Sequence, residues 1–180
     1  MTRKKSQYDE IADRYDGLFT DAASLSENAE VGEMLRPLSG SVLDIGCGTG
    51  LLTEIVGIES DKYMGVDPSN RMLQKFREKH GEYRNLVCAY YDGVVVDCNQ
   101  FDNVVSLFGS PSYLSNVALL RIAKCRGSLF LMFYKEDYHP VTYEKCGVEF
   151  KHKNHSKKEL SMIFGGAEIK EYNNYIIVRK

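Results

Sequence analysis

The sequence lacks the features that define several specialised classes of protein. Its 180 residues hold no tryptophan, no internal repeat and no low-complexity segment. No stretch approaches the roughly 18 consecutive apolar residues of a membrane-spanning helix. The basic start Met1–Lys5 is followed by polar residues rather than by the apolar core of a secretory signal. We therefore expect one soluble domain without membrane contact, long enough to bury a core.

An excess of charge of one sign is also missing. The 23 Lys and Arg are balanced by 25 Asp and Glu, which gives a formal net charge of −2. Proteins that bind nucleic acid usually present a basic surface, so nucleic acid is not an expected partner. One basic cluster stands in the last third of the chain, and we expect it to be solvated surface. It comprises Lys151, Lys153, Lys157 and Lys158.

The cysteines are scattered and odd in number. The five of them include no C-x-x-C pair, which argues against a disulfide framework and against a zinc site, so no metal is expected. The simplest setting for such a chain is reducing and cytoplasmic.

What the sequence does contain is a regular alternation of strand and helix patterns. Apolar residues at steps of three and four predict helices over 8–19 and 25–36. A less regular stretch spans 135–155, and two strands close the chain around the turn Asn173-Asn174. Further strands are expected at 41–45, 62–66, 85–89, 102–107 and 128–134, with helices between them. This pattern predicts an α/β fold, with a mostly parallel twisted sheet of about seven strands, helices on both faces and an antiparallel C-terminal hairpin.

One run, VLDIGCGTG at Val42–Gly50, places three glycines on alternate positions directly after an apolar strand. Each glycine weakens regular structure by about 0.5–1 kcal/mol relative to alanine, so the backbone itself is needed here. In open parallel sheets, ligands bind beyond the carboxyl ends of the strands. A dinucleotide site needs G-x-G-x-x-G, but Leu51 stands at the third glycine position, which disfavours a dehydrogenase.

The run resembles the first motif of the class I S-adenosylmethionine-dependent methyltransferases. GVDPSNRML at Gly65–Leu73 resembles their second motif, and FDNVVSLFGSPSYL at Phe101–Leu114 resembles their fourth strand and the segment after it. The opening YDEIADRYD is similar to the lead-in of small-molecule members. The resemblance implies a Rossmann-like single domain over 1–180. Its parts would be a helical lid (1–38), a cofactor-binding core (39–134), a substrate-side insertion (135–155) and a closing helix and hairpin (156–180).

The resemblance also implies how S-adenosylmethionine is held. Asp44 would hold the amino group of the methionine moiety, Asp67 would accept both ribose hydroxyls, and Tyr15 would close over the methionine end. Either Tyr90 or Asp92 would meet the adenine amino group, and the sequence leaves both open. The full implied set is Tyr15, Asp44, Gly46, Cys47, Gly48, Gly50, Asp67, Pro68, Met72, Tyr90, Asp92, Ser106 and Leu107.

The segment after the fourth strand narrows the methyl acceptor. It carries neither the N/D-P-P-Y/F motif of base and glutamine methyltransferases nor a Pro-Cys pair, and it resembles small-molecule members. The expected reaction is in-line transfer to O, N or S of a small organic molecule, releasing S-adenosylhomocysteine. Candidate substrate-facing residues, drawn from three expected lid segments, are Tyr8, Phe108, Tyr113, Tyr138 and Tyr143.

The need for a general base stays open. Should an oxygen require deprotonation, His139, His152 and His155 are the candidates, although all three could equally be surface histidines. Two other functions also remain open. One is a regulatory or partner subunit that binds the cofactor without catalysis. The other is an RNA or protein methyltransferase that depends on a partner for recognition. The chain is expected to be a monomer or a homodimer.

Overall fold

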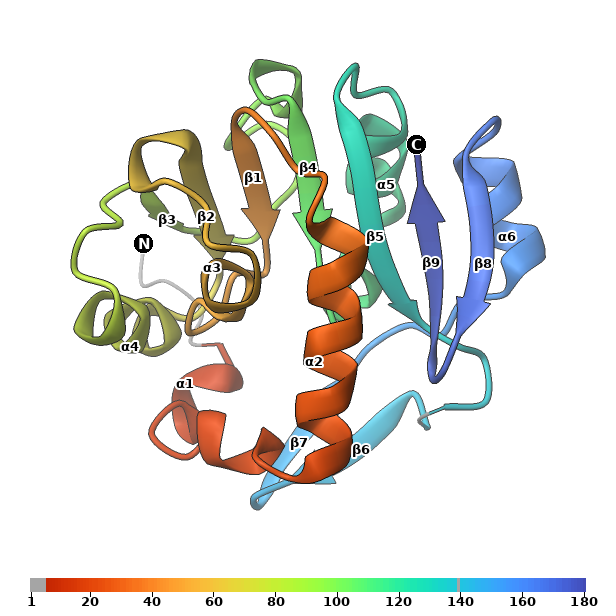
Figure 1. Cartoon of the computed structure of the whole chain (residues 1–180). Coiled ribbons are helices and arrows are strands. Elements are labelled where there is room, and N and C mark those ends of the chain that lie inside the picture. The colour runs from red at the N-terminus through yellow and green to blue at the C-terminus, as the bar shows by residue number, and fades with distance from the viewer. Residues whose placement is uncertain (1–5, 139) are drawn as a thin grey trace.

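The computed structural model describes residues 6–138 and 140–180, so the candidate base His139 lies outside the described residues. Seven strands form one sheet in the order β3-β2-β1-β4-β5-β9-β8 (Figure 1). Only β9 runs against its neighbours, which confirms a mostly parallel sheet with a C-terminal hairpin. The strands are β1 Val42–Ile45, β2 Tyr63–Asp67, β3 Leu86–Cys88, β4 Asn103–Ser106, β5 Ser128–Tyr134, β8 Glu168–Tyr172 and β9 Tyr175–Arg179.

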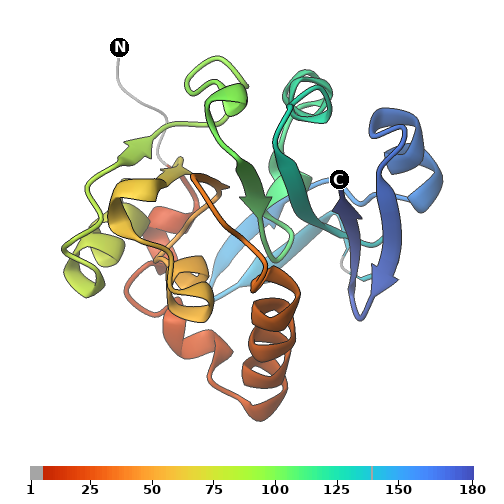
Figure 2. The ribbon, with the colours of Figure 1, turned by 45° about the horizontal axis from the view of Figure 1, so that its top comes forward.

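Helices cover both faces of the sheet, as Figure 1 and the turned view in Figure 2 show. The first face carries α2 Ala22–Leu35, α3 Leu51–Val56 and α4 Asn70–Lys79, and the second carries α5 Asn116–Ala123 and α6 Lys157–Ile163. Four of these helices begin at a side chain that accepts backbone N–H groups, which stabilises a helix start by about 1 kcal/mol. These N-cap residues are Asp21, Ser69, Ser115 and Ser156.

The core lies in two layers because side chains of a strand alternate between the faces of a sheet. In β5, Leu131 and Phe133 pack with α5 and α6, whereas Met132 and Tyr134 belong to the cluster under α2, α3 and α4. This alternation decides which side chains of β5 reach the functional site.

The N-terminal segment is more broken than its periodicity predicts. The helix expected over 8–19 is instead the short α1 Tyr8–Ile11 followed by the 3-10 turn η1 Asp16–Phe19. Three further 3-10 turns connect the main elements: η2 Ser60–Lys62, η3 Cys98–Gln100 and η4 Ser110–Tyr113.

The stretch expected to be irregular contains a β-hairpin. Strands β6 Thr142–Lys145 and β7 Val148–Lys151 pair antiparallel outside the main sheet. Their turn is Cys146-Gly147, and both residues have positive φ angles of 55° and 77°. A cysteine rarely adopts this conformation, so the usual Asn-Gly or Asp-Gly signal of such a turn is missing from the sequence.

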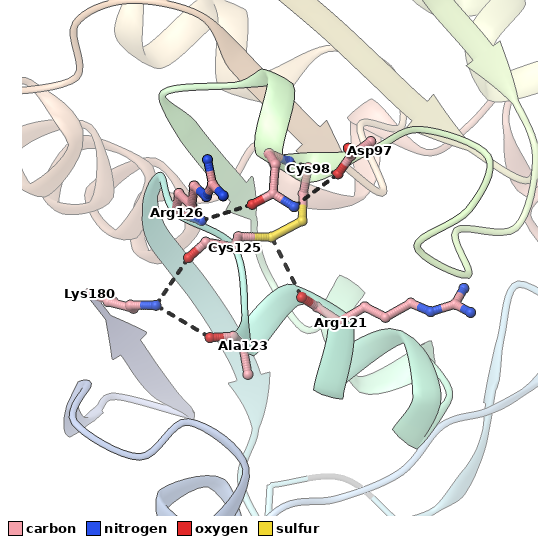
Figure 3. The surroundings of a disulfide bond; sticks show 8 residues. Asp97, Cys98, Arg121, Ala123, Cys125, Arg126 and Lys180 are labelled. Carbon is pink, nitrogen blue, oxygen red and sulfur yellow. Dashed lines mark hydrogen bonds between the residues drawn. A yellow bond between two sulfur atoms is a disulfide. The ribbon is translucent and has the colours of Figure 1, made fainter.

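One disulfide forms, although the scattered cysteines argued against a disulfide framework. Cys98 and Cys125 are bonded, with their Cα atoms 5.9 Å apart (Figure 3). They are 27 residues apart in sequence, but η3 leads into β4 and the turn after α5 leads into β5. Because β4 and β5 are parallel neighbours, their starts meet at one edge of the sheet. Sequence spacing alone does not show this contact.

The described residues hold neither a candidate membrane-spanning helix nor a candidate metal site. Over residues 6–138 and 140–180, no helix is both long and apolar enough to cross a membrane. Within the same ranges, no group of three or more His, Cys, Asp or Glu side chains is placed to hold a metal ion.

Candidate functional site

The site lies at the sheet edge where the parallel strands end, the lower edge in Figure 1. The strand order reverses between β1 and β4, the position at which open α/β sheets bind ligands. A cavity of about 620 Å³ opens there, between the lid segments α1 and η1, the N-terminal half of α2 and the β6–β7 hairpin. Its wall includes Tyr8, Tyr15, Glu27, Thr49, Phe108, Tyr134, Tyr138, Tyr143, Lys145, Phe150 and Tyr175.

The glycine loop at the end of β1 combines close packing with one open side. Gly46, Gly48 and Gly50 all have positive φ angles, of 79°, 52° and 101°. A Cβ atom at Gly46 would lie 2.6 Å from the Ser110 side chain, and one at Gly50 would lie 2.8 Å from the His80 ring. At Gly48 it would meet nothing within 4 Å. The loop therefore needs glycine for its own conformation and leaves its backbone open to a ligand at Gly48.

Asp67 connects this loop to the next one. Its carboxylate accepts the Gly48 N–H at 3.0 Å and the Ser69 N–H at 2.7 Å, and the residue is 7% exposed. The hydroxyl of Ser106 donates to the Ile45 carbonyl at 2.6 Å, which joins the ends of β4 and β1. Leu107 is buried in the core beneath them. The ends of three strands are thus held together by side chains that the sequence assigned to the cofactor site.

Two members of the predicted cofactor set lie inside the protein. Asp44 is 2% exposed, accepts the Tyr63 hydroxyl at 2.7 Å, and burial raises its pKa to about 7. Cys47 is buried against Gly65, and burial raises the pKa of its thiol. Cys47 is therefore an uncharged side chain that fills space beside β2. The contact of Asp44 with an amino group stays a prediction.

The two candidates for the adenine contact differ in their surroundings. The Asp92 carboxylate accepts the N–H groups of Val94 and Val95, and these hydrogen bonds hold its pKa below the ordinary value. Its carbonyl accepts a hydrogen bond from Arg121 of α5. Tyr90 is 58% exposed. Asp92 is therefore engaged within its own loop, and the choice between the two residues stays a prediction.

The lid is attached to α4 by paired charges, which we call the lid seam. Asp13 contacts both Arg71 and Lys75, the latter at 3.0 Å, and Asp16 contacts Lys79 at 3.0 Å. Asp16 also accepts the Thr49 hydroxyl at 2.5 Å, which ties the lid to the glycine loop.

Asp9 adds a contact of the same kind at the start of α4. It accepts the Ser69 hydroxyl at 2.6 Å and the Arg71 N–H at 3.1 Å. The sequence reasoning missed this seam, although Asp9, Asp13 and Asp16 recur at helical steps, as do Arg71, Lys75 and Lys79.

Two predicted cofactor residues lie near the seam, Met72 in α4 and Tyr15 in the lid itself. Met72 is 1% exposed and packs with Ile11, Ala12 and Phe150. Tyr15 is half-buried, and both the removal of its phenol from water and, to a smaller extent, the negative charge of Asp67 raise its pKa. Pro68 directly follows Asp67 at the end of β2.

A cluster of aromatic rings joins the three expected lid segments. The Tyr8 hydroxyl donates to the Tyr113 hydroxyl at 3.1 Å, and the hydroxyls of Tyr113 and Tyr143 also lie 3.1 Å apart. Phe150, which the sequence reasoning missed, packs on Tyr8 at 4.8 Å and stacks on Tyr143 at 5.5 Å between centroids. Residues from α1, η4 and the β6–β7 hairpin thus form one continuous wall.

The two described histidine candidates lie on different sides of the sheet. The His152 ring lies 4.6 Å from Tyr134 and 5.4 Å from Tyr143, and burial lowers its pKa, so it is neutral at pH 7. His155 is fully buried against Phe133 on the other face, and burial lowers its pKa to about 4. His155 is therefore neither substrate-facing nor on the surface. Of this pair, His152 contacts two tyrosines of the cavity wall but is not among the residues that line the cavity.

Comparison with known proteins gives matches to methyltransferases. A family model described as a methyltransferase domain matches residues 42–126. The rat mitochondrial ubiquinone biosynthesis O-methyltransferase is 30% identical over 111 residues, which cover 53% of this chain and 31% of that protein. A Thermotoga maritima methyltransferase, described as a possible histamine N-methyltransferase, superposes with a TM-score of 0.72 at 16% identity, covering 96% of both chains. Each of these matches is to a methyltransferase, and the family model covers residues 42–126 of this chain.

A third match is a solved structure described as a complex with SAH. The DhpI–SAH complex superposes with a TM-score of 0.66 at 18% identity, covering 96% of this chain and 91% of that one. Residues of this chain fit S-adenosylmethionine. The open side at Gly48 gives room for a ligand against the backbone, and the Asp67 carboxylate stands at the end of β2 with Tyr15 near it.

Proposed function

We propose that this chain transfers a methyl group from S-adenosylmethionine to O, N or S of a small organic molecule. The observation that carries the proposal is the cavity of about 620 Å³ beside the glycine loop, walled by aromatic side chains of the lid segments. Pockets for small molecules usually measure about 300–1,000 Å³ and are mainly apolar with a few polar groups. A macromolecular substrate would instead need an open and usually charged surface.

The chain itself contributes orientation and the exclusion of water. S-adenosylmethionine, when bound, supplies a methyl group on a positively charged sulfur, so the cofactor carries the difficult part of the chemistry. The lid seam would hold the lid closed, and the aromatic cluster of the lid segments would hold the acceptor in line with the methyl group. Such orientation contributes about 7–11 kcal/mol to catalysis. For an acceptor that must lose a proton, His152 is the described neutral imidazole that contacts two tyrosines of the cavity wall.

Calorimetric titration with S-adenosylmethionine tests the cofactor assignment. Replacing Asp67 by alanine should weaken binding about tenfold or more, because a hydrogen bond to a charged group contributes about 1.5–3 kcal/mol. Asp61→Ala is a matched control, since Asp61 is an exposed acid of η2 just before the same strand. Thermal melting of both variants would show whether each still folds. Absence of binding to the native chain would contradict the proposal.

Turnover distinguishes an enzyme from a binding subunit. The native chain should release S-adenosylhomocysteine when offered a panel of small alcohols, amines and thiols, with the rate measured for each acceptor. Tight binding without release for any acceptor would instead favour the non-catalytic subunit. A strong rate on tRNA that falls steeply with salt would favour the partner-dependent RNA enzyme.

A further inference from the structure

One end of the cavity is formed by three tyrosines, which we call the tyrosine wall. Tyr134 ends β5, Tyr138 follows it, and Tyr175 begins β9. Their ring centroids lie 5.6 Å apart for Tyr134 and Tyr138, 5.6 Å for Tyr138 and Tyr175, and 5.7 Å for Tyr134 and Tyr175. Burial raises the pKa of all three phenols, so the rings are neutral at physiological pH. The wall therefore offers aromatic faces without a charge of its own.

Glu27 of α2 lines the same cavity. It lies close enough to Tyr138 and Tyr175 for its negative charge to raise the pKa of both. Its carboxylate accepts one amide hydrogen bond, from Asn173 at 3.3 Å, and no cation pairs with it among residues 6–138 and 140–180. Partial burial raises its own pKa. A half-buried carboxylate without a counter-ion is costly, because removing the charge from water is not offset by a partner.

Most other charged groups of the cavity have partners, and Glu144 is exposed on the β6–β7 hairpin. Lys79 contacts Asp16 and Glu54, and the Lys145 ammonium lies 3.9 Å from the centre of the Phe19 ring. On α2 itself, Glu30 accepts the Tyr172 hydroxyl and Glu33 pairs with Arg36. Glu27 is the acid of α2 that faces both the cavity and the aromatic rings. This placement matches a ligand that brings a positive charge.

We propose that Glu27 and the tyrosine wall bind a positively charged amino group of the methyl acceptor. The carboxylate supplies the opposite charge, and the ring faces attract a cation through their quadrupoles, an interaction that strengthens where water is excluded. The acceptor class is therefore a small organic molecule with an amino group that is protonated when it binds. A methyl group could be transferred to that nitrogen only after the proton is lost, because a protonated nitrogen has no lone pair. This inference rests on the proposed function for the role of its ligand, but the binding of a cation is measurable without turnover.

A pair of probes with the same shape tests the charge requirement. Choline carries a quaternary ammonium group, and 3,3-dimethyl-1-butanol is its neutral counterpart. Calorimetric titration of the full chain should show choline binding at least about tenfold tighter than the alcohol. Equal binding of both, binding of neither, or tighter binding of the anion 3,3-dimethylbutanoate would overturn the inference.

A matched pair of variants assigns the effect to Glu27. The substitution Glu27→Gln keeps the shape and the Asn173 hydrogen bond but removes the charge, and it should weaken choline binding about tenfold or more. Glu33→Gln, two turns along the same helix and paired with Arg36, should leave choline binding unchanged. Unchanged choline binding in Glu27→Gln, or equal losses in both variants, would overturn the assignment.

S-adenosylmethionine titration of the same variants separates this inference from the proposed function. Glu27→Gln should bind the cofactor as the native chain does, because the contacts of Glu27 are with Asn173 and the tyrosine wall rather than with the glycine loop. Loss of cofactor binding in Glu27→Gln would overturn its assignment to the acceptor. Failure of the native chain to bind the cofactor would contradict the methyltransferase proposal, while the choline result would still decide the cation site.

Discussion

Asp44 illustrates how burial sets the chemistry of one residue. The motif places an acid inside β1, and the fold covers it almost completely, with the Tyr63 hydroxyl as its hydrogen-bond partner. Burial disfavours the charged carboxylate and raises the pKa to about 7, more than the Tyr63 hydrogen bond lowers it. Near neutral pH this side chain therefore exchanges a proton, which an exposed aspartate does not.

The raised pKa makes stability depend on pH. Between about pH 4, where an unfolded aspartate titrates, and pH 7, the folded chain binds more protons than the unfolded chain. Its stability therefore falls as pH rises through this window. Asp44→Asn keeps an acceptor for Tyr63 but cannot ionise. Urea unfolding at pH 5 and pH 7.5 should show the native chain losing about 2.5 kcal/mol relative to this variant. A difference that does not change with pH would contradict the buried, near-neutral carboxyl.

At the scale of elements, the lid and α4 behave as one unit. Asp13 and Asp16 contact basic residues of α4, and the short α1 buries Ile11 against Met72. Exposed ion pairs contribute little individually and are screened by salt. The apolar contact therefore supplies most of the attachment, and the charges orient the lid over the glycine loop.

Loosening the lid seam should speed cofactor release. In Asp13→Asn, which removes the partner of Arg71 and Lys75, we expect S-adenosylmethionine to dissociate a few-fold faster at low salt. Raising the salt concentration should bring the native chain toward the variant, because salt screens exposed charges. Stopped-flow dissociation measures both rates. Glu168→Gln removes an exposed pair on β8, far from the lid, and should have no effect. A native rate independent of salt would show that the seam does not hold the lid.

Over the whole molecule, the disulfide and the candidate site lie at opposite edges of the sheet. Cys98 and Cys125 are buried where β4 and β5 begin, and the Lys180 side chain donates to the Cys125 carbonyl at 3.0 Å (Figure 3). The cavity lies where the same strands end. Removing the disulfide should therefore affect the stability of the sheet and not the contacts of the cavity.

Thiol counting tests the disulfide directly. In denaturant without reductant, we expect three reactive thiols per chain, those of Cys47, Cys88 and Cys146, rather than five. The free energy of unfolding of the double variant Cys98→Ala, Cys125→Ala should be about 2–4 kcal/mol lower than that of the native chain, as for a typical disulfide that closes a loop. Its affinity for S-adenosylmethionine should stay the same, since the site lies at the other edge. Five reactive thiols would contradict the bond.

The conformation of the glycine loop was predictable because its requirements are local. The positive φ angles of the glycine loop favour glycine at these positions. Asp67 could be singled out because it is the last residue of a strand that the sequence pattern predicts. The acceptor end was less predictable. Tyr134, Tyr175 and Glu27 come from three separate elements, and no short sequence pattern links them.

The sequence by itself determined the alternation of strands and helices, the sheet type and the position of the glycine loop. These follow from hydrophobic periodicity and backbone conformation, which act between neighbours in the chain. Only the tertiary structure decided which distant residues meet. Tyr8 reaches Tyr113 across 105 residues, Cys98 reaches Cys125, and His155 packs on the face away from the cavity. Such contacts depend on strand order and register, where a shift of one residue moves a side chain to the opposite face of the sheet.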